Sequence, residues 1–306
     1  MKTGKEQHTI PYFYLNQFIN PGWVYNLGSP QPKRVQSARS TAVREFYYSQ
    51  NTDEEDYPLD SINTYIEGYA APILRELLMS EDGLTGAKKW IFSHFISNLA
   101  LRVPPYIEET GEAIINLMEQ IDYKTKRTLE KLEKDGIKIE KDQPLIKYET
   151  GESDSFTWTR NGWEKELGSM REKSKAGKAM MKENMSIITD LAKVIAKMSW
   201  FIIDAPAEAF FITSDRPVYL TNRDASKLVT GWANHNAFGT LPLSPRRYLI
   251  LSYLYPSDTW AYKQASIKEA EYLNARTVAS AKYAIYSPEK YPPAENWLRK
   301  AVQEGR

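Results

Sequence analysis

Residues 181–203 read MKENMSIITDLAKVIAKMSWFII, and the spacing of the apolar residues changes within them. Up to position 198 the apolar residues recur every three or four positions, as on one face of an α-helix: Met181, Met185, Ile188, Leu191, Ile195 and Met198. Four consecutive apolar residues then follow from Trp200 to Ile203, which is typical of a buried strand. The stretch therefore predicts a junction between a helical and a sheet-rich portion of the chain.

Upstream of this junction the sequence predicts a mainly helical portion, about residues 61–199. Ser61 is a candidate N-cap, and apolar residues follow it at helical spacing as far as Leu77. Residues 90–101 are apolar on nearly all sides, which predicts a helix buried in the middle of the domain. Pro104 is expected to end this helix, because proline interrupts helical hydrogen bonding.

A polar segment interrupts the helical portion at about residues 142–178. A charged helix over residues 114–132 precedes it and is expected to end at Asp135-Gly136. The segment itself is rich in Ser, Gly and Lys and poor in apolar residues, so it has little to bury. We expect a mobile insertion there.

Downstream of the junction, residues 200–255 contain short β-prone runs separated by Pro, Gly and Asn. The runs span residues 200–203, 209–213, 218–221, 227–230 and 248–253. This spacing predicts a small, mostly antiparallel sheet, and two helices at about 267–281 and 294–302 are expected to end the chain. The predicted fold class is α+β, mainly helical, with the sheet in the C-terminal half and a single domain over residues 1–306.

The composition excludes several classes of protein. The chain of 306 residues carries 40 Lys and Arg against 39 Asp and Glu, so no global charge favours nucleic acid. It has no cysteine, which excludes disulfides, thiolate zinc sites and a cysteine nucleophile. No stretch approaches the ~18 uninterrupted apolar residues of a membrane helix, and the N-terminus has no secretory core. We therefore expect a cytoplasmic protein with no membrane association.

Several standard catalytic motifs are absent from the sequence. It contains no G-x-x-x-x-G-K-S/T, G-x-G-x-x-G, G-x-S-x-G or H-E-x-x-H pattern, and its three histidines cannot form a histidine-rich metal site. The basic tracts at 124–141 and 165–182 contain interleaved Glu and Asp, which favours a solvated surface over a nucleic-acid interface. Any chemistry must come from residues that are distant in the sequence.

The histidines differ in their surroundings. His8 precedes residues 9–18, TIPYFYLNQF, a proline-stiffened aromatic segment that would hold the imidazole in place. It is a candidate general acid or base, and a backbone hydrogen bond at the domain edge is an equal alternative. His94 falls in the buried helix and is predicted to be a satisfied core histidine. For His235, in a polar loop, a surface position is favoured over a ligand contact.

Three charged residues stand at apolar segments. Asp215 follows the run Phe210-Phe211-Ile212, where an isolated carboxylate would be unfavourable, so a cleft, a cation or a metal ion should face it. A turn cap before Pro217 is the alternative. Glu67 lies at the edge of an apolar stripe and Arg102 at the end of the buried helix. For this pair, an ion pair between two helices is favoured over a substrate-binding role.

A set of short motifs extends over nearly the whole chain. They are His8-Thr9-Ile10-Pro11-x-x-Tyr14-Leu15-x-x-Phe18, Phe46-Tyr47, Ile66-Glu67, Arg102-x-Pro104, residues 211–218 (FITSDRPV), Pro242-Leu243-Ser244-Pro245 and Asn274. With these motifs the chain resembles the bacterial and fungal family called domain of unknown function 4238. That family often has Asn where this chain has Arg216. The resemblance implies a single-domain protein without an established activity, with some relatives in antiphage-defence neighbourhoods.

The polar members of these motifs are His8, Glu67, Arg102, Ser214, Asp215 and Asn274. Packing alone would not require them, so we expect them to converge, with His8, Glu67, Arg102 and Asp215 in one pocket. His8, Glu67 and Asp215 would then be catalytic, whereas Arg102, Ser214 and Asn274 would bind the substrate. Glu67 and Asp215 would be the ligands of any divalent metal such as Mg²⁺, which this set allows without requiring it.

Two hypotheses for the function follow. The first is an antiphage-defence effector that hydrolyses nucleic acid or a nucleotide through this pocket. The alternative is a non-enzymatic binding or sensing module that recognises a protein partner through the aromatic surface near Trp23, Trp158 and Trp163.

Overall fold

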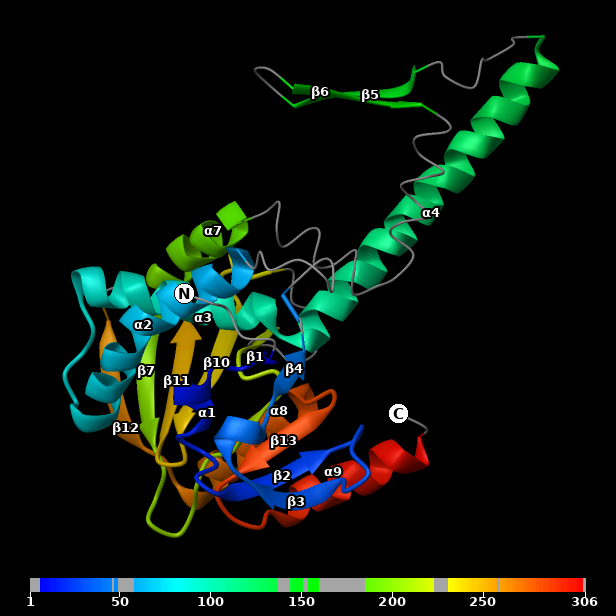
Figure 1. Ribbon diagram of the computed structural model, residues 1–306. Helices are drawn as coiled ribbons and strands as arrows, with labels where there is room; N and C mark the ends of the chain where they lie inside the picture. Colours follow the sequence, from blue (N-terminus) through cyan, green and yellow to red (C-terminus); the bar gives the residue numbers. More distant parts are fainter. Residues whose placement is uncertain are drawn as a thin grey trace. The chain divides into compact units, whose positions relative to one another are not determined.

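The computed structural model of the chain has an α+β architecture, as the sequence predicted (Figure 1). It describes residues 6–45, 47–48, 58–136, 144–150, 154–159, 185–222, 231–257 and 259–304. The chain divides into two compact units, one of Met1–Tyr106 with Asn184–Arg306 and one of Ile107–Glu183. Among the described residues, no helix combines the length and apolar character needed to cross a membrane.

A five-stranded sheet forms the centre of the first unit. Its strands, in spatial order, are β12 (Trp260–Gln264), β7 (Ser199–Asp204), β11 (Arg247–Ser252), β10 (Ala237–Ser244) and β9 (Tyr219–Asn222). Neighbouring strands are antiparallel except β12, which runs parallel to β7. The predicted strands at 200–203, 218–221 and 248–253 are therefore present within a residue or two, whereas 227–230 lies outside the described residues.

A second sheet corrects the prediction that the strands are confined to one small sheet in the C-terminal half. Its order is β3 (Lys33–Gln36), β2 (Gly22–Asn26), β13 (Ala284–Ser287) and β8 (Thr213–Ser214). β1 (Glu6–His8) and β4 (Val43–Glu45) form a further antiparallel pair. These strands are only two to five residues long. An alternation of apolar and polar residues over so few positions does not identify a strand in the sequence.

Helices cover the two larger sheets. α1 (Tyr12–Leu15), α2 (Pro58–Met79), α3 (Gly86–Arg102) and α7 (Met185–Ala196) share one buried cluster with the five-stranded sheet (Figure 1). α8 (Ile267–Ser280) begins at a capping box formed by Ser266 and Glu269. α9 (Pro292–Gln303) packs on β2, with Trp297 and Leu298 in a second buried cluster. The N-terminal segment thus belongs to the core of this unit.

Two helical predictions need correction. α2 begins at Pro58, so Ser61 lies inside the helix and does not cap it. α3 buries Phe92, Phe95, Ile96 and Leu99 completely, as predicted, but His94 is partly exposed. Its Nδ1 lies 3.1 Å from the carbonyl oxygen of Trp90, one turn earlier. The apolar pattern located the helix correctly but could not show which side stays open.

The second unit contains the greater part of α4 (Pro104–Lys134), which ends directly before Asp135-Gly136 as predicted. Gly136 has φ +79°, a backbone conformation that glycine adopts without strain. β5 (Pro144–Thr150) and β6 (Asp154–Thr159) then form an antiparallel pair, which the sequence did not predict. The remainder of the predicted insertion at 142–178 lies outside the described residues.

Candidate functional site

Asp215 lies at the end of β8 and is tied to the start of β13 by three hydrogen bonds. Its Oδ1 accepts from the backbone N–H of Lys282 at 3.0 Å, and its Oδ2 accepts from that of Tyr283 at 2.8 Å. The Asp215 backbone N–H donates to the carbonyl oxygen of Ala284 at 2.9 Å. Asp215 therefore fixes the point at which β13 enters the second sheet.

The environment of Asp215 perturbs its protonation. The residue is 6% exposed, and this burial raises the pKa of the carboxyl group to about 6. The backbone N–H groups that it accepts from, and the nearby charge of Arg216, act in the opposite direction and limit the shift. At pH 7 the group is mainly ionised, but it accepts a proton far more readily than a solvent-exposed aspartate.

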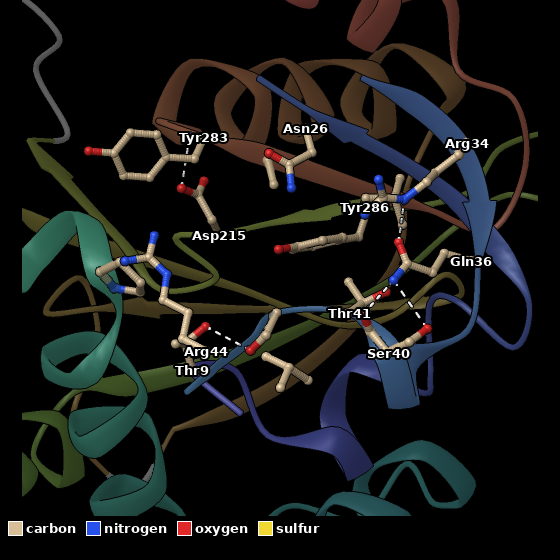
Figure 2. Close-up of a pocket in the computed structure, with 15 residues that line it drawn as sticks. Thr9, Asn26, Arg34, Gln36, Ser40, Thr41, Arg44, Asp215, Tyr283 and Tyr286 are labelled. Carbon is tan, nitrogen blue, oxygen red and sulfur yellow. Dashed lines mark hydrogen bonds between the residues drawn. The ribbon is translucent and has the colours of Figure 1, made fainter. Parts of the chain in front are cut away.

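Asp215 also lines a cavity of about 180 Å³ between the second sheet and the β1–β4 pair (Figure 2). The cavity is lined by Thr9, Val24, Asn26, Arg34, Gln36, Ser40, Thr41, Ala42, Val43, Arg44, Pro104, Asp215, Tyr283, Ala284 and Tyr286. Most of these side chains are polar, and Asp215 is the only acidic residue among them. The cavity is therefore suited to a small polar ligand that carries negative charge.

Two arginines give the cavity its positive charge. Arg34 donates from Nε to Oε1 of Gln36 at 2.6 Å and from Nη1 to Oγ of Ser29. Gln36 in turn donates from Nε2 to Oγ of Ser40 at 3.1 Å, so the wall around Arg34 is held by its own hydrogen bonds. The guanidinium carbon of Arg44 lies 5.5 Å from the centre of the Tyr47 ring. In Figure 2 the Tyr286 ring lies between the Asp215 and Arg34 ends of the cavity.

The phenol of Tyr286 is buried in this wall. Burial raises its pKa, the negative charge of Asp215 raises it further, and Arg44 partly offsets the shift. The hydroxyl group therefore stays protonated throughout the physiological range of pH. In this protonated form the hydroxyl group can donate a hydrogen bond.

A second polar group surrounds Arg102, which is only 1% exposed. Its Nη1 lies 2.6 Å from Oε1 of Glu67, which confirms the ion pair between two helices that was the favoured alternative. Nη1 also donates to Asn98, and Nε donates to the carbonyl oxygen of Thr9 at 3.3 Å. The guanidinium group is therefore occupied by protein partners and ties α3 to α2 and to the N-terminal segment.

His8 belongs to this second group through its backbone. Its carbonyl oxygen accepts from Oη of Tyr48 at 3.1 Å and from Nη2 of Arg102 at 3.5 Å. The imidazole contacts the Tyr12 ring edge-on, at 6.1 Å between ring centres. Its Nε2 is buried and has no hydrogen-bond partner in the described part of the chain.

The expected set of polar residues is thus divided between two adjoining groups. His8, Glu67 and Arg102 come together, but none of them lines the cavity of Asp215. Thr9 joins the two groups, because its carbonyl oxygen accepts from Arg102 while its side chain lines the cavity. The expected convergence of His8, Glu67, Arg102 and Asp215 on a single pocket is therefore not seen at this cavity and stays a prediction.

Ser214 and Asn274 contact the backbone around Asp215 and do not line the cavity. Ser214 Oγ accepts from the backbone N–H of Arg216 at 3.2 Å. Asn274 on α8 accepts from the N–H of Ile212 at 3.1 Å and donates to the carbonyl oxygen of Phe210 at 2.7 Å. Both side chains hold residues 210–216 in place, which accounts for their presence without a ligand.

The sequence did not single out Arg34, Arg44 or Tyr286, which lie on three short strands. The alternation of Arg34 and Gln36 along β3 is the one signal that could have placed both on the same face. No cluster of three or more His, Asp or Glu close enough to hold a metal ion occurs in the described ranges.

The comparisons with known proteins assign the chain to a family. No curated protein and no solved structure matches it. A family model described as "Protein of unknown function (DUF4238)" matches residues 6–290, which contain the two larger sheets of the first unit and the Asp215 cavity. The chain belongs to the DUF4238 family.

Proposed function

We propose that the protein is a hydrolase that acts on a nucleotide or another small phosphate ester in the Asp215 cavity. One observation carries the proposal: a buried carboxyl group with a pKa of about 6 lines the same cavity of about 180 Å³ as Arg34 and Arg44. A general acid or base works best with a pKa near the working pH. Arginine binds phosphate oxygens through paired N–H donors, so the two arginines favour a phosphate-containing substrate.

The proposed step uses Asp215 as a general base. A water molecule attacks the phosphorus atom while its proton passes to the Asp215 carboxylate. The bond from phosphorus to the leaving oxygen breaks, and Asp215 returns the proton to that oxygen. Arg34 and Arg44 stabilise the charge on the phosphate oxygens, and the Tyr286 hydroxyl donates a hydrogen bond to the substrate.

Hydrolysis of this kind agrees with the antiphage role that the family resemblance led us to expect. An effector that depletes nucleotides or cleaves nucleic acid would arrest the growth of an infected cell. Under the proposal, expression of the wild-type protein during infection slows growth, and the Asp215→Asn variant does not. His8, Glu67 and Arg102 form the neighbouring polar group and take no part in the step.

The test measures phosphate release by the purified protein from a panel of nucleotides and short oligonucleotides. Arg44→Ala is expected to lower kcat/KM by about tenfold or more, because one charge-assisted contact to phosphate is lost. Arg39→Ala is the matched control, since Arg39 is an exposed arginine on the neighbouring helical turn Ala38–Ser40 and does not line the cavity. The proposal fails if folded wild-type protein releases no product from any of these substrates.

A second candidate is a binding or sensing module that holds an anionic ligand without turnover. The observation that favours it is that both carboxylate oxygens of Asp215 already accept hydrogen bonds from backbone N–H groups, which is a structural role. The side chains of Ser214 and Asn274 likewise accept hydrogen bonds from backbone N–H groups. Calorimetry separates the candidates: this module would bind a nucleotide, weaken when Arg44 is removed, and release no phosphate.

The hypothesis that a protein partner binds through the aromatic surface near Trp23, Trp158 and Trp163 has less support. The Trp23 ring already stacks on Tyr25 and is covered by the ammonium group of Lys33 at 5.4 Å. Trp163 and the side chain of Trp158 lie outside the described residues. A partner bound through this surface therefore stays a prediction, to be tested by exchanging Trp23 for alanine in a binding assay.

A further inference from the structure

An aromatic groove lies between α2 and α3 and shares no residue with the Asp215 cavity. It has a volume of about 270 Å³ and is lined by Tyr65, Ile66, Tyr69, Trp90, Ile91 and His94. The spacing explains how the rings gather, because positions four apart lie on the same face of a helix. The Tyr65 and Tyr69 ring centres are 5.0 Å apart, and those of Trp90 and His94 are 4.3 Å apart.

The large rings of this groove are unusually open to solvent. Tyr65 is 67% exposed, Tyr69 is 52% exposed and Trp90 is 38% exposed. Beneath them Ile66 and Ile91 pack against the main buried cluster and form an apolar floor. Three open aromatic rings over such a floor form a surface that gains stability when a ligand covers it.

The electrostatic character of the groove indicates which ligand fits. The faces of aromatic rings carry partial negative charge and attract cations. Elsewhere in this protein that attraction is satisfied internally, as by Arg276 over Tyr272 at 5.6 Å and Arg247 over Tyr262 at 4.7 Å. Among the described residues no Lys or Arg covers Tyr65, Tyr69 or Trp90. The groove is thus complementary in charge to a cation from outside.

The lining also restricts the kind of cation. It contains no carboxylate, so a strongly hydrated ammonium ion would lose its water without gaining a counter-charge. A quaternary ammonium group is weakly hydrated, and its methyl groups can pack on Ile66 and Ile91. We propose that the groove binds a small soluble trimethylammonium compound, with the cationic head against the rings of Tyr65, Tyr69 and Trp90.

His94 adds a preference for a hydroxyl group on this ligand. Its Nδ1 faces the Trp90 carbonyl oxygen at 3.1 Å, and in the neutral imidazole this nitrogen donates to that oxygen. In this tautomer Nε2 is a hydrogen-bond acceptor. A trimethylammonium alcohol such as choline satisfies both parts of the site, since its hydroxyl donates to Nε2 while its head contacts the rings.

The first experiment titrates choline into the full-length protein and measures binding by calorimetry. We expect a dissociation constant of about 1 mM, in line with a few partly exposed cation–π contacts. The control ligand is 3,3-dimethyl-1-butanol, which has the shape of choline but no charge, and we expect it to bind at least about tenfold more weakly. Equal affinity for the two ligands, or no choline binding at about 50 mM, would overturn the proposal.

Variants locate the binding to this groove. Trp90→Leu keeps an apolar side chain and removes the aromatic face, so choline affinity should fall by about tenfold, with little change for the neutral alcohol. Tyr69→Leu, at a position 52% exposed, gives a second test that does not depend on how Trp90→Leu folds. Tyr272→Leu is the matched control, because this exposed tyrosine of α8 is already covered by Arg276.

A vesicle assay separates a soluble ligand from a lipid headgroup with the same chemistry. We expect the protein not to co-sediment with phosphatidylcholine vesicles and to retain choline binding in their presence. Co-sedimentation that depends on Trp90, without binding of free choline, would overturn the soluble ligand proposed here. Equal choline binding by Trp90→Leu, Tyr69→Leu and wild type would overturn the site itself.

Discussion

The Oδ2 atom of Asp215 accepts the backbone N–H of Tyr283 at 2.8 Å, and both residues line the same cavity. The hydrogen bond joins β8 to the start of β13, which carries Tyr286 into the cavity wall two strand positions after Ala284. Substitution of Asp215 therefore changes the architecture of the cavity as well as its chemistry. Stability and turnover have to be measured separately for every variant at this position.

Asp215 should make the stability of the protein depend on pH. Its pKa in the folded state, about 6, is above the ordinary value of 3.8, so folding favours the protonated form. The contribution is fully present below pH 3.8 and is lost as pH rises to about 6, a loss of about 3 kcal/mol in the free energy of unfolding. The measurement compares denaturation of wild type and Asp215→Asn between these limits. If the difference in the free energy of unfolding between the two proteins did not change with pH, the raised pKa of Asp215 would be contradicted.

Arg102 should matter for stability and not for turnover by folded protein. Arg102→Met leaves Glu67 and the carbonyl oxygen of Thr9 without their partner, and loss of one member of a buried ion pair costs about 3–5 kcal/mol. Chemical denaturation measures this cost, with Lys193→Met as the control because its pair with Asp190 is exposed. A stable Arg102→Met protein that has lost phosphate release would show that Arg102 acts on the substrate.

Asn274 should contribute stability by holding the chain before β8. Asn274→Ala removes its hydrogen bonds to Ile212 and Phe210, and we expect a loss of about 2–3 kcal/mol because the backbone groups stay buried. Asn296→Ala on α9 is the matched control and should change stability by less than about 0.5 kcal/mol, since Asn296 is exposed. Equal stability of the two variants would contradict the conclusion that Asn274 holds the chain before β8 in place.

Tyr14 tests whether the N-terminal segment is part of the core. Its Oη is 2.9 Å from Oγ1 of Thr213 and donates to the carbonyl oxygen of Pro242 at 2.7 Å. Tyr14→Phe should therefore cost about 1–3 kcal/mol, because an acceptor is left buried without its donor. Tyr12→Phe, two residues away and 46% exposed, should leave the midpoint of thermal unfolding nearly unchanged. Equal effects of the two substitutions would count against this packing.

The helices were predictable because their apolar spacing persists over several turns. α3, α7, α8 and α9 lie within a few residues of the predicted ranges. The strands were harder to predict from the sequence. β10 contains Gly239 and Pro242, both unfavourable in a strand, and is nevertheless the neighbour of β9 and β11, with its pairing irregular near Pro242.

The candidate site could be predicted only in part. The charge of Asp215 after an apolar run indicated a special environment, and the structure shows a cavity there. The ion pair between Glu67 and Arg102 was the favoured interpretation of Glu67 at the edge of an apolar stripe and Arg102 at the end of the buried helix. Arg34 could not be found, because its place in the cavity depends on the pairing of β2 with β13, residues more than two hundred positions apart. Arg44 lies on β4, which pairs, among the described strands, only with the three-residue strand β1.

The pH dependence of phosphate release tests the central claim most directly. If Asp215 is the general base, log kcat/KM for the best nucleotide substrate rises with pH as the carboxyl group ionises, with a midpoint at about 6, and is level above it. Asp215→Asn protein that remains folded should lose the rising limb and at least about a hundredfold in kcat/KM. Unchanged turnover in that variant, or the same rising limb, would contradict the account.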